Sequence, residues 1–77
     1  MARVLKINPA DTVWVALTDL PAGEKIDCNG VPVTLMHAIS AKHKFVERTL
    51  QPGEEIIMYG VVVGKAITLI PQGSAIT

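Results

Sequence analysis

One pattern of aliphatic and turn-forming residues occurs three times along the chain. Each copy has an aliphatic residue three positions before a glycine, an isoleucine three positions after it, and a proline one or two positions before the same glycine. The copies are Leu20–Ile26, Leu50–Ile56 and Ile70–Ile76. Proline fixes φ at the value that enters a turn, and glycine accepts the positive φ that leaves it. Each copy therefore predicts a corner at which two strands turn their aliphatic ends into a core.

Alternating and β-branched apolar residues predict strands between these corners. The predicted strands cover residues 4–7, 12–17, 25–27, 31–35, 42–49, 55–58, 61–64 and 66–70. Asn29-Gly30 is the clearest hairpin signal, and Pro32 places the second arm of that hairpin at a sheet edge because proline cannot donate to a ladder. Residues 36–40 fit one helical turn, which is too short to count as a helix. The β-branched run 61–63 lies between two glycines and predicts a buried or tightly bent strand.

Length and composition indicate a single, mainly β domain over residues 1–77. The corner glycines are unevenly spaced along the chain, which excludes a solenoid of equal repeats and favours one compact, pseudo-repetitive module. A domain of this size buries only about 60 to 65% of the surface of its unfolded chain. Its hydrophobic content of 49%, before the six glycines are counted, is high for a soluble domain. We therefore expect an exposed apolar surface suited to a partner or a neighbouring domain.

Charge and aromatic content argue against nucleic acid as a ligand. Seven basic and seven acidic side chains cancel, and Trp, Tyr and Phe occur once each. Phosphate binding needs a basic surplus, and single-strand binding needs several aromatic platforms. Charges interrupt the N-terminal stretch where a signal peptide would be apolar, and no run reaches membrane-spanning length. The single cysteine, Cys28, cannot form an internal disulfide. We expect a cytoplasmic protein, since a free thiol suits a reducing compartment.

The densest polar cluster runs from Lys42 to Arg48. As a strand, it would place its basic residues Lys42, Lys44 and Arg48 on one face and His43 on the other. One interpretation is a cationic strip that holds a carboxylate, with His43 near a metal or a transferring proton. The other is a solvated outer strand whose lysines discourage edge-to-edge pairing. The residues alone favour the outer strand, because strands commonly alternate charged and apolar faces.

Other candidates for chemistry stand alone in the sequence. His37 and His43 could share a metal, but no nearby Cys, His or carboxylate completes a recognisable ligand spacing. Tyr59 could present its hydroxyl to a ligand, although a buried ring with its hydroxyl at the surface is the favoured interpretation. Glu54 and Glu55 face opposite ways on a strand, which favours turn solubilisers over an acid/base pair. Taken alone, the chain lacks a full catalytic set.

Two stretches change this weighting. They are Ala41–Phe45, which reads Ala-Lys-His-Lys-Phe, and Met58–Ala66, which fits the pattern Tyr-Gly-x-x-[Ile/Val]-Gly-x-Ala. With the three corners in the same order, the chain resembles the N-terminal domain of the altronate/galactarate dehydratase family, a module of the SAF (antifreeze-like, β-clip) type. The resemblance covers nearly the whole chain from about Ile7 onward. It implies a small, barrel-like β-clip with pseudo-repeated strand corners.

The resemblance also implies a function. Family members dehydrate sugar acids such as altronate and galactarate, and relatives cleave sulfolactate, generally with Fe²⁺ or another divalent metal. By this resemblance, His43, Lys44, Lys42 and Tyr59 are candidates for contacting the substrate, and His43 is the candidate metal ligand. The family pattern follows the third corner with a histidine-rich segment ending in His-Asn. This sequence does not contain that segment, which leaves metal binding by the chain alone open.

The resemblance implies a partner as well, because the module occurs either fused to a larger catalytic region or as a separate small subunit. The leading hypothesis is therefore an accessory domain or small subunit of a sugar-acid hydro-lyase, which is not catalytic alone and which could form a homo-oligomer. A non-catalytic module that binds carboxylated sugars is one alternative. A purely structural docking domain is the other.

Overall fold

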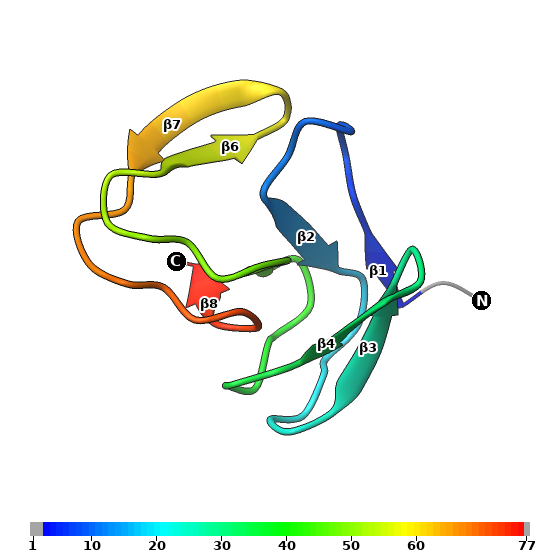
Figure 1. Cartoon of the computed structure of the whole chain (residues 1–77). Helices are drawn as coiled ribbons and strands as arrows, with labels where there is room; N and C mark the ends of the chain where they lie inside the picture. Colours follow the sequence, from blue (N-terminus) through cyan, green and yellow to red (C-terminus); the bar gives the residue numbers. More distant parts are fainter. Residues whose placement is uncertain (1–2, 77) are drawn as a thin grey trace.

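Short strands joined by turns make up the described chain. The computed structural model describes residues 3–76, and the strands there are β1 (Val4–Leu5), β2 (Val13–Ala16), β3 (Lys25–Cys28), β4 (Val31–Thr34), β5 (Lys44–Val46), β6 (Glu55–Met58), β7 (Val61–Lys65) and β8 (Ala75–Ile76). One antiparallel sheet has the order β1-β2-β5-β8, and β3–β4 and β6–β7 are separate hairpins (Figure 1). The expected mainly β class is confirmed.

Helical structure plays no part in the fold between residues 3 and 76. The helical turn expected at residues 36–40 is wrong, because Ile39 is extended and bridges Leu20. In the same described range, no helix has the length and apolar character needed to cross a membrane.

All three predicted corners are confirmed. Their glycines have positive φ, at 83° for Gly23, 91° for Gly53 and 85° for Gly73. A fourth corner was not predicted, because Lys42 occupies the glycine position there with φ 72°. This corner has the same aliphatic spacing, with Ile39 three residues before Lys42 and an apolar residue three after it.

The four corners also share one hydrogen-bonding scheme. In each, the N–H of the positive-φ residue donates to a carbonyl of a neighbouring strand or loop: Gly23 to Leu35 (2.7 Å), Lys42 to Ala16 (2.7 Å), Gly53 to Ala66 (2.7 Å) and Gly73 to Val46 (3.1 Å). The described chain therefore contains two copies of one arrangement, in which two corners accompany one hairpin. We call the corners at Gly23 and Lys42 with hairpin β3–β4 the first unit. The corners at Gly53 and Gly73 with hairpin β6–β7 form the second unit.

The two hairpins have equivalent tips. Asn29 (φ 53°) and Gly30 (φ 85°) form the first tip, and Tyr59 (φ 56°) and Gly60 (φ 76°) form the second. Two consecutive positive φ values define the type I′ turn that joins twisted strands, so the hairpin predicted at Asn29-Gly30 is confirmed.

A β-bulge distinguishes the second hairpin from the first. Ile56 pairs with Gly64 and Ile57 with Val62, so the register shifts and Val63 is the additional residue. Equivalent positions therefore lie 30 residues apart before the bulge, as for Gly23 and Gly53, and 31 apart after it, as for Lys42 and Gly73.

The buried core is divided unevenly between the units. One cluster contains Trp14, Ala16, Leu20, Ile26, Cys28, Val33, Leu35, Ile39 and Phe45. The other contains only Val13, Val46, Leu50 and Ala66, and the residues packed against it are just partly buried: Ile56, Met58, Ile70 and Ile76. The second unit thus has the smaller and more open core.

Two expectations about strand burial are wrong. β5 is not a solvated outer strand, since it lies between β2 and β8 with Phe45 and Val46 fully buried. Lys42 lies in a corner instead of on that strand, so the basic residues do not form one continuous strand face. The run 61–63 is not buried, because each of its valines is about half exposed, and it carries the bulge described above.

Candidate functional site

Two of the predicted site residues meet in the folded chain. Lys44 begins β5, and Tyr59 is the first residue of the β6–β7 tip. The Lys44 Nζ lies 5.6 Å from the centroid of the Tyr59 ring, within the range of a cation–π contact. Tyr59 is 55% exposed, so the interpretation of a buried ring is wrong. The pair presents an ammonium group and a phenol at the surface.

The ammonium group of Lys44 has no carboxylate partner within residues 3–76. The ion pairs found there are Arg3–Glu24, Lys6–Glu47 and Arg48–Glu54. Neither Lys44 nor the exposed Lys42 takes part in them. Because neither ammonium group is paired with a carboxylate of the described chain, both could take a carboxylate ligand as their counter-ion.

A buried carboxylate holds the tip that carries Tyr59. Asp11 is 3% exposed, and its carboxylate accepts the Gly60 N–H at 2.7 Å through Oδ1 and the Asn8 N–H at 3.1 Å through Oδ2. A β-carbon at Gly60 would lie 2.7 Å from the side-chain nitrogen of Asn8 and would displace that amide, and the positive φ of 76° also favours glycine. The neighbouring Thr12 adds a second attachment, since its Oγ1 accepts the Ile57 N–H at 3.1 Å.

Opposing effects act on the pKa of Asp11. Burial raises the pKa, while hydrogen bonds from the backbone N–H groups of Gly60, Tyr59 and Asn8, with the nearby charge of Lys6, lower it. The hydrogen bonds and the charge prevail, so the pKa lies below its usual range. Asp11 is thus an ionised acceptor that fixes the position of the Tyr59 tip.

Sequence reasoning missed Asp11, although the repeat contains a signal for it. At the first tip, the Gly30 N–H donates to Asp27 of the same hairpin at 2.7 Å. The equivalent position in the second hairpin is Ile57, whose side chain has no acceptor. Asp11 supplies the missing carboxylate from outside the hairpin, and a comparison of the two tips would have pointed to it.

The other predicted site residues lie nearby in sequence but are not joined to the pair. Lys42 and His43 are exposed, and within residues 3–76 no hydrogen bond or ion pair links their side chains to Lys44 or Tyr59. His37 Nδ1 accepts the Ala75 N–H at 3.2 Å, so this nitrogen already has a partner within the chain. The described residues contain no group of three or more His, Cys, Asp or Glu that could hold a metal ion.

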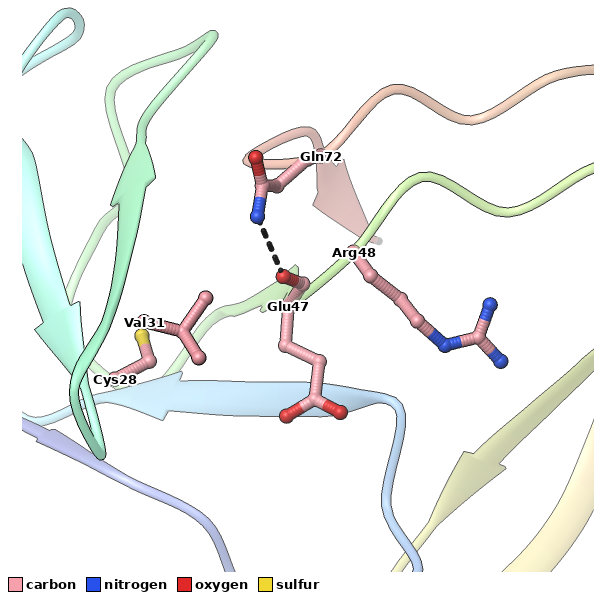
Figure 2. A pocket seen from close by; sticks show the side chains of 5 residues that line it. All are labelled: Cys28, Val31, Glu47, Arg48 and Gln72. Carbon is pink, nitrogen blue, oxygen red and sulfur yellow. Dashed lines mark hydrogen bonds between the residues drawn. The ribbon is translucent and has the colours of Figure 1, made fainter.

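A cavity of about 230 Å³ lies on another part of the surface, lined by Cys28, Val31, Glu47, Arg48 and Gln72 (Figure 2). The Gln72 amide donates to the Glu47 carbonyl at 3.0 Å, and the Arg48 side chain extends away from the other lining side chains. The Glu47 carboxylate already accepts from Lys6 (3.0 Å) and from the Trp14 indole (2.9 Å). The polar groups of this cavity are thus largely satisfied within the chain.

Cys28 brings no nucleophile to that cavity. Burial raises the pKa of its thiol to about 11, and the negative charges of Glu47 and Asp27 add to the effect. The thiolate, which is the reactive form, is therefore scarce near neutral pH.

Comparison with known proteins agrees with the motifs around this site. A family model described as the altronate/galactarate dehydratase SAF domain matches residues 2–77. The altronate dehydratase of Escherichia coli (strain K12) is 35% identical over 71 residues, which are 92% of this chain and 14% of that protein. The altronate dehydratase of Bacillus subtilis (strain 168) is 30% identical over 76 residues, which are 99% of this chain and 15% of that protein. The chain thus spans about a seventh of the length of these relatives.

Proposed function

Because the chain belongs to the family of altronate/galactarate dehydratase SAF domains, we propose that it is the accessory domain of a sugar-acid dehydratase in the cytoplasm. In this proposal a larger catalytic region, fused to the chain or bound as a second subunit, supplies most of the catalytic groups. The chain forms one wall of the substrate cleft. Altronate and galactarate are the proposed substrate class, and a sulfolactate-like acid is a related possibility.

The observation that carries the proposal is the contact between Lys44 and Tyr59. These residues lie in the two motifs that mark the family, and the fold brings the ammonium group to 5.6 Å from the ring centroid. Every substrate of this class has a carboxylate. Lys44 supplies a positive charge to bind it, and the exposed Tyr59 supplies a hydroxyl that can donate to it.

Dehydration beside a carboxylate also needs groups that this chain does not hold. A base must remove the α-proton and an acid must assist the departing hydroxyl, and a divalent metal such as Fe²⁺ supplies the acid function when bound. The described residues do not form a complete metal site, so most ligands of such a metal would come from the larger catalytic region. His43 is exposed and is the candidate ligand from this chain.

The proposal is tested by removing the Lys44 charge in the complete enzyme. Lys44→Met should raise the KM for altronate or galactarate about ten- to a hundredfold, since a charge-assisted contact is worth about 1.5–3 kcal/mol. Lys25→Met, at an exposed lysine on the first hairpin, is the matched control and should leave KM unchanged. Equal effects of the two substitutions, or no effect of either, would refute the role of Lys44.

A second candidate function is a sugar-acid binding module without catalysis. It is favoured by one observation, namely that the Lys44–Tyr59 pair forms within this chain without a partner. This function requires that the isolated chain bind altronate or galactarate and that His43→Ala weaken the binding. A purely structural docking domain requires instead that His43→Ala and Lys44→Ala change neither catalysis nor affinity.

A further inference from the structure

The second unit exposes an unusual amount of aliphatic surface over residues 61–69. The exposed side chains of this segment are Val61 (61%), Val62 (48%), Val63 (57%), Ile67 (95%) and Leu69 (49%). They follow the Tyr59-Gly60 tip along β7, the outer strand of its hairpin, and the loop after it (Figure 1). We call this stretch the 61–69 segment.

The first unit shows what the same hairpin looks like when its outer face meets water. Asp27 and Pro32 pair across the first hairpin and are exposed, while Val33 on the other face is fully buried. In the second hairpin, Ile57 and Val62 replace the exposed pair, and Gly64 replaces the buried valine. An antiparallel hairpin with one solvated face alternates polar and apolar residues, and the second hairpin does not. The apolar outer side of the second hairpin is therefore typical of a hairpin that packs against another domain or subunit.

The loop after β7 also lacks contacts that its equivalent makes. In the first unit, the Met36 N–H donates to the Gly73 carbonyl at 3.0 Å, and the Gly73 turn packs so closely on Thr34 that a β-carbon would lie 2.0 Å from the Thr34 oxygen. The position equivalent to Met36 is Ile67. Within residues 3–76, Ile67 makes no backbone hydrogen bond of this kind, and its side chain is almost wholly exposed. The Gly73 turn thus packs on the backbone of the first unit at this place, although the Met36 side chain is 55% exposed, and the second unit has no corresponding contact within the described residues.

We propose that the 61–69 segment is the docking surface for the larger catalytic region of the dehydratase, an inference that rests on the proposed function. The curated relatives extend far beyond this domain, which accounts for 14 to 15% of their length. The segment begins directly after the Tyr59-Gly60 tip, so a catalytic region that binds it would lie next to the Lys44–Tyr59 pair. Docking there covers the aliphatic side chains and brings catalytic groups beside the proposed carboxylate site.

Amide hydrogen exchange tests the position of this surface. Exchange is measured in the isolated chain and in the complete dehydratase, and the hairpin of the first unit serves as the internal control. Amides of residues 61–69 should exchange at least about tenfold more slowly in the complete enzyme, whereas those of residues 25–34 should not change. No protection of residues 61–69, or equal protection of both hairpins, overturns the proposal.

A pair of substitutions tests the same surface by affinity. Ile67→Asp should leave the folding of the isolated chain unchanged, because the side chain is 95% exposed, and should weaken association with the larger catalytic region at least about tenfold. Met36→Asp, at the position of the first unit equivalent to Ile67 and 55% exposed, should leave association unchanged. If both weaken it equally or neither does, the surface is wrong. Self-association of the isolated chain that Ile67→Asp abolishes would assign the surface to a second copy and also overturn the proposal.

These measurements are separable from the proposed function. Protection of residues 61–69 in an enzyme that does not dehydrate sugar acids would retain the docking surface and refute the function. Dehydration of altronate or galactarate without protection of residues 61–69 would retain the proposed function and refute the docking surface.

Discussion

Asp11 links the N-terminal turn to the tip that carries Tyr59. Because its pKa in the folded chain is below the usual value of about 4, folding favours the ionised form. Its contribution to stability is therefore complete above about pH 4 and is lost as the pH falls below that value toward the lowered pKa of the folded state.

This reasoning predicts the behaviour of Asp11→Asn. The substitution removes the charge and one acceptor, so it should lower the free energy of unfolding at pH 7 by about 1–3 kcal/mol. The loss should be smaller at a pH below about 4, because the carboxyl is protonated first in the unfolded chain and the advantage of its lowered pKa in the folded chain is then lost. Urea unfolding at the two pH values measures it. Asp27→Asn removes the charge of the equivalent but exposed acceptor at the first tip, where the amide oxygen can still accept the Gly30 N–H, and it should cost less. A loss that is independent of pH, or equal for both variants, would contradict this account of Asp11.

At the scale of residues, the sequence identified groups but not their environments. Lys44 and Tyr59 were selected from the family motifs, and the structure places them in contact. The exposure of Tyr59 was mispredicted, because a lone aromatic residue in a small domain is usually buried, whereas this one occupies a left-handed position in a hairpin tip. Asp11 was overlooked, since the burial of a carboxylate depends on a hairpin nearly fifty residues away in the chain.

At the scale of elements, prolines and glycines made the corners predictable. The fourth corner escaped because Lys42 adopts the positive φ that glycine has elsewhere. β5 was misjudged because charged residues surround it in sequence, yet the strand is only Lys44–Val46, and two of its residues belong to the core. The charged residues thus predicted solvent exposure correctly for the corner at Lys42 and wrongly for β5 itself.

Two corner glycines with similar φ provide a controlled test of the repeat. Gly53→Ala meets no atom within 4 Å and should cost only the left-handed backbone penalty of about 1–2 kcal/mol. Gly73→Ala places a β-carbon 2.0 Å from the Thr34 backbone oxygen, so the corner must move. It should cost more than about 3 kcal/mol or prevent folding. Circular dichroism and urea unfolding measure both, and equal losses would show that the corner does not pack on Thr34 as described.

At the scale of the whole molecule, the two units are built alike but are not equally complete. The first unit has the larger core and packs against the Gly73 turn, while the second has a smaller core and an aliphatic outer side. The Lys44–Tyr59 pair lies where β5 meets the tip of the second hairpin. The candidate site and the uncovered surface are therefore neighbours, as expected for a domain that completes a cleft with a larger partner.

The most direct test of this account is the rate of altronate and galactarate dehydration by the larger catalytic region, measured with Fe²⁺ in the presence and absence of this chain. We predict that the reaction requires the chain, that adding the wild-type chain restores it, and that the Lys44→Met chain restores it poorly at low substrate concentration. An unchanged rate when the chain is left out would contradict the account.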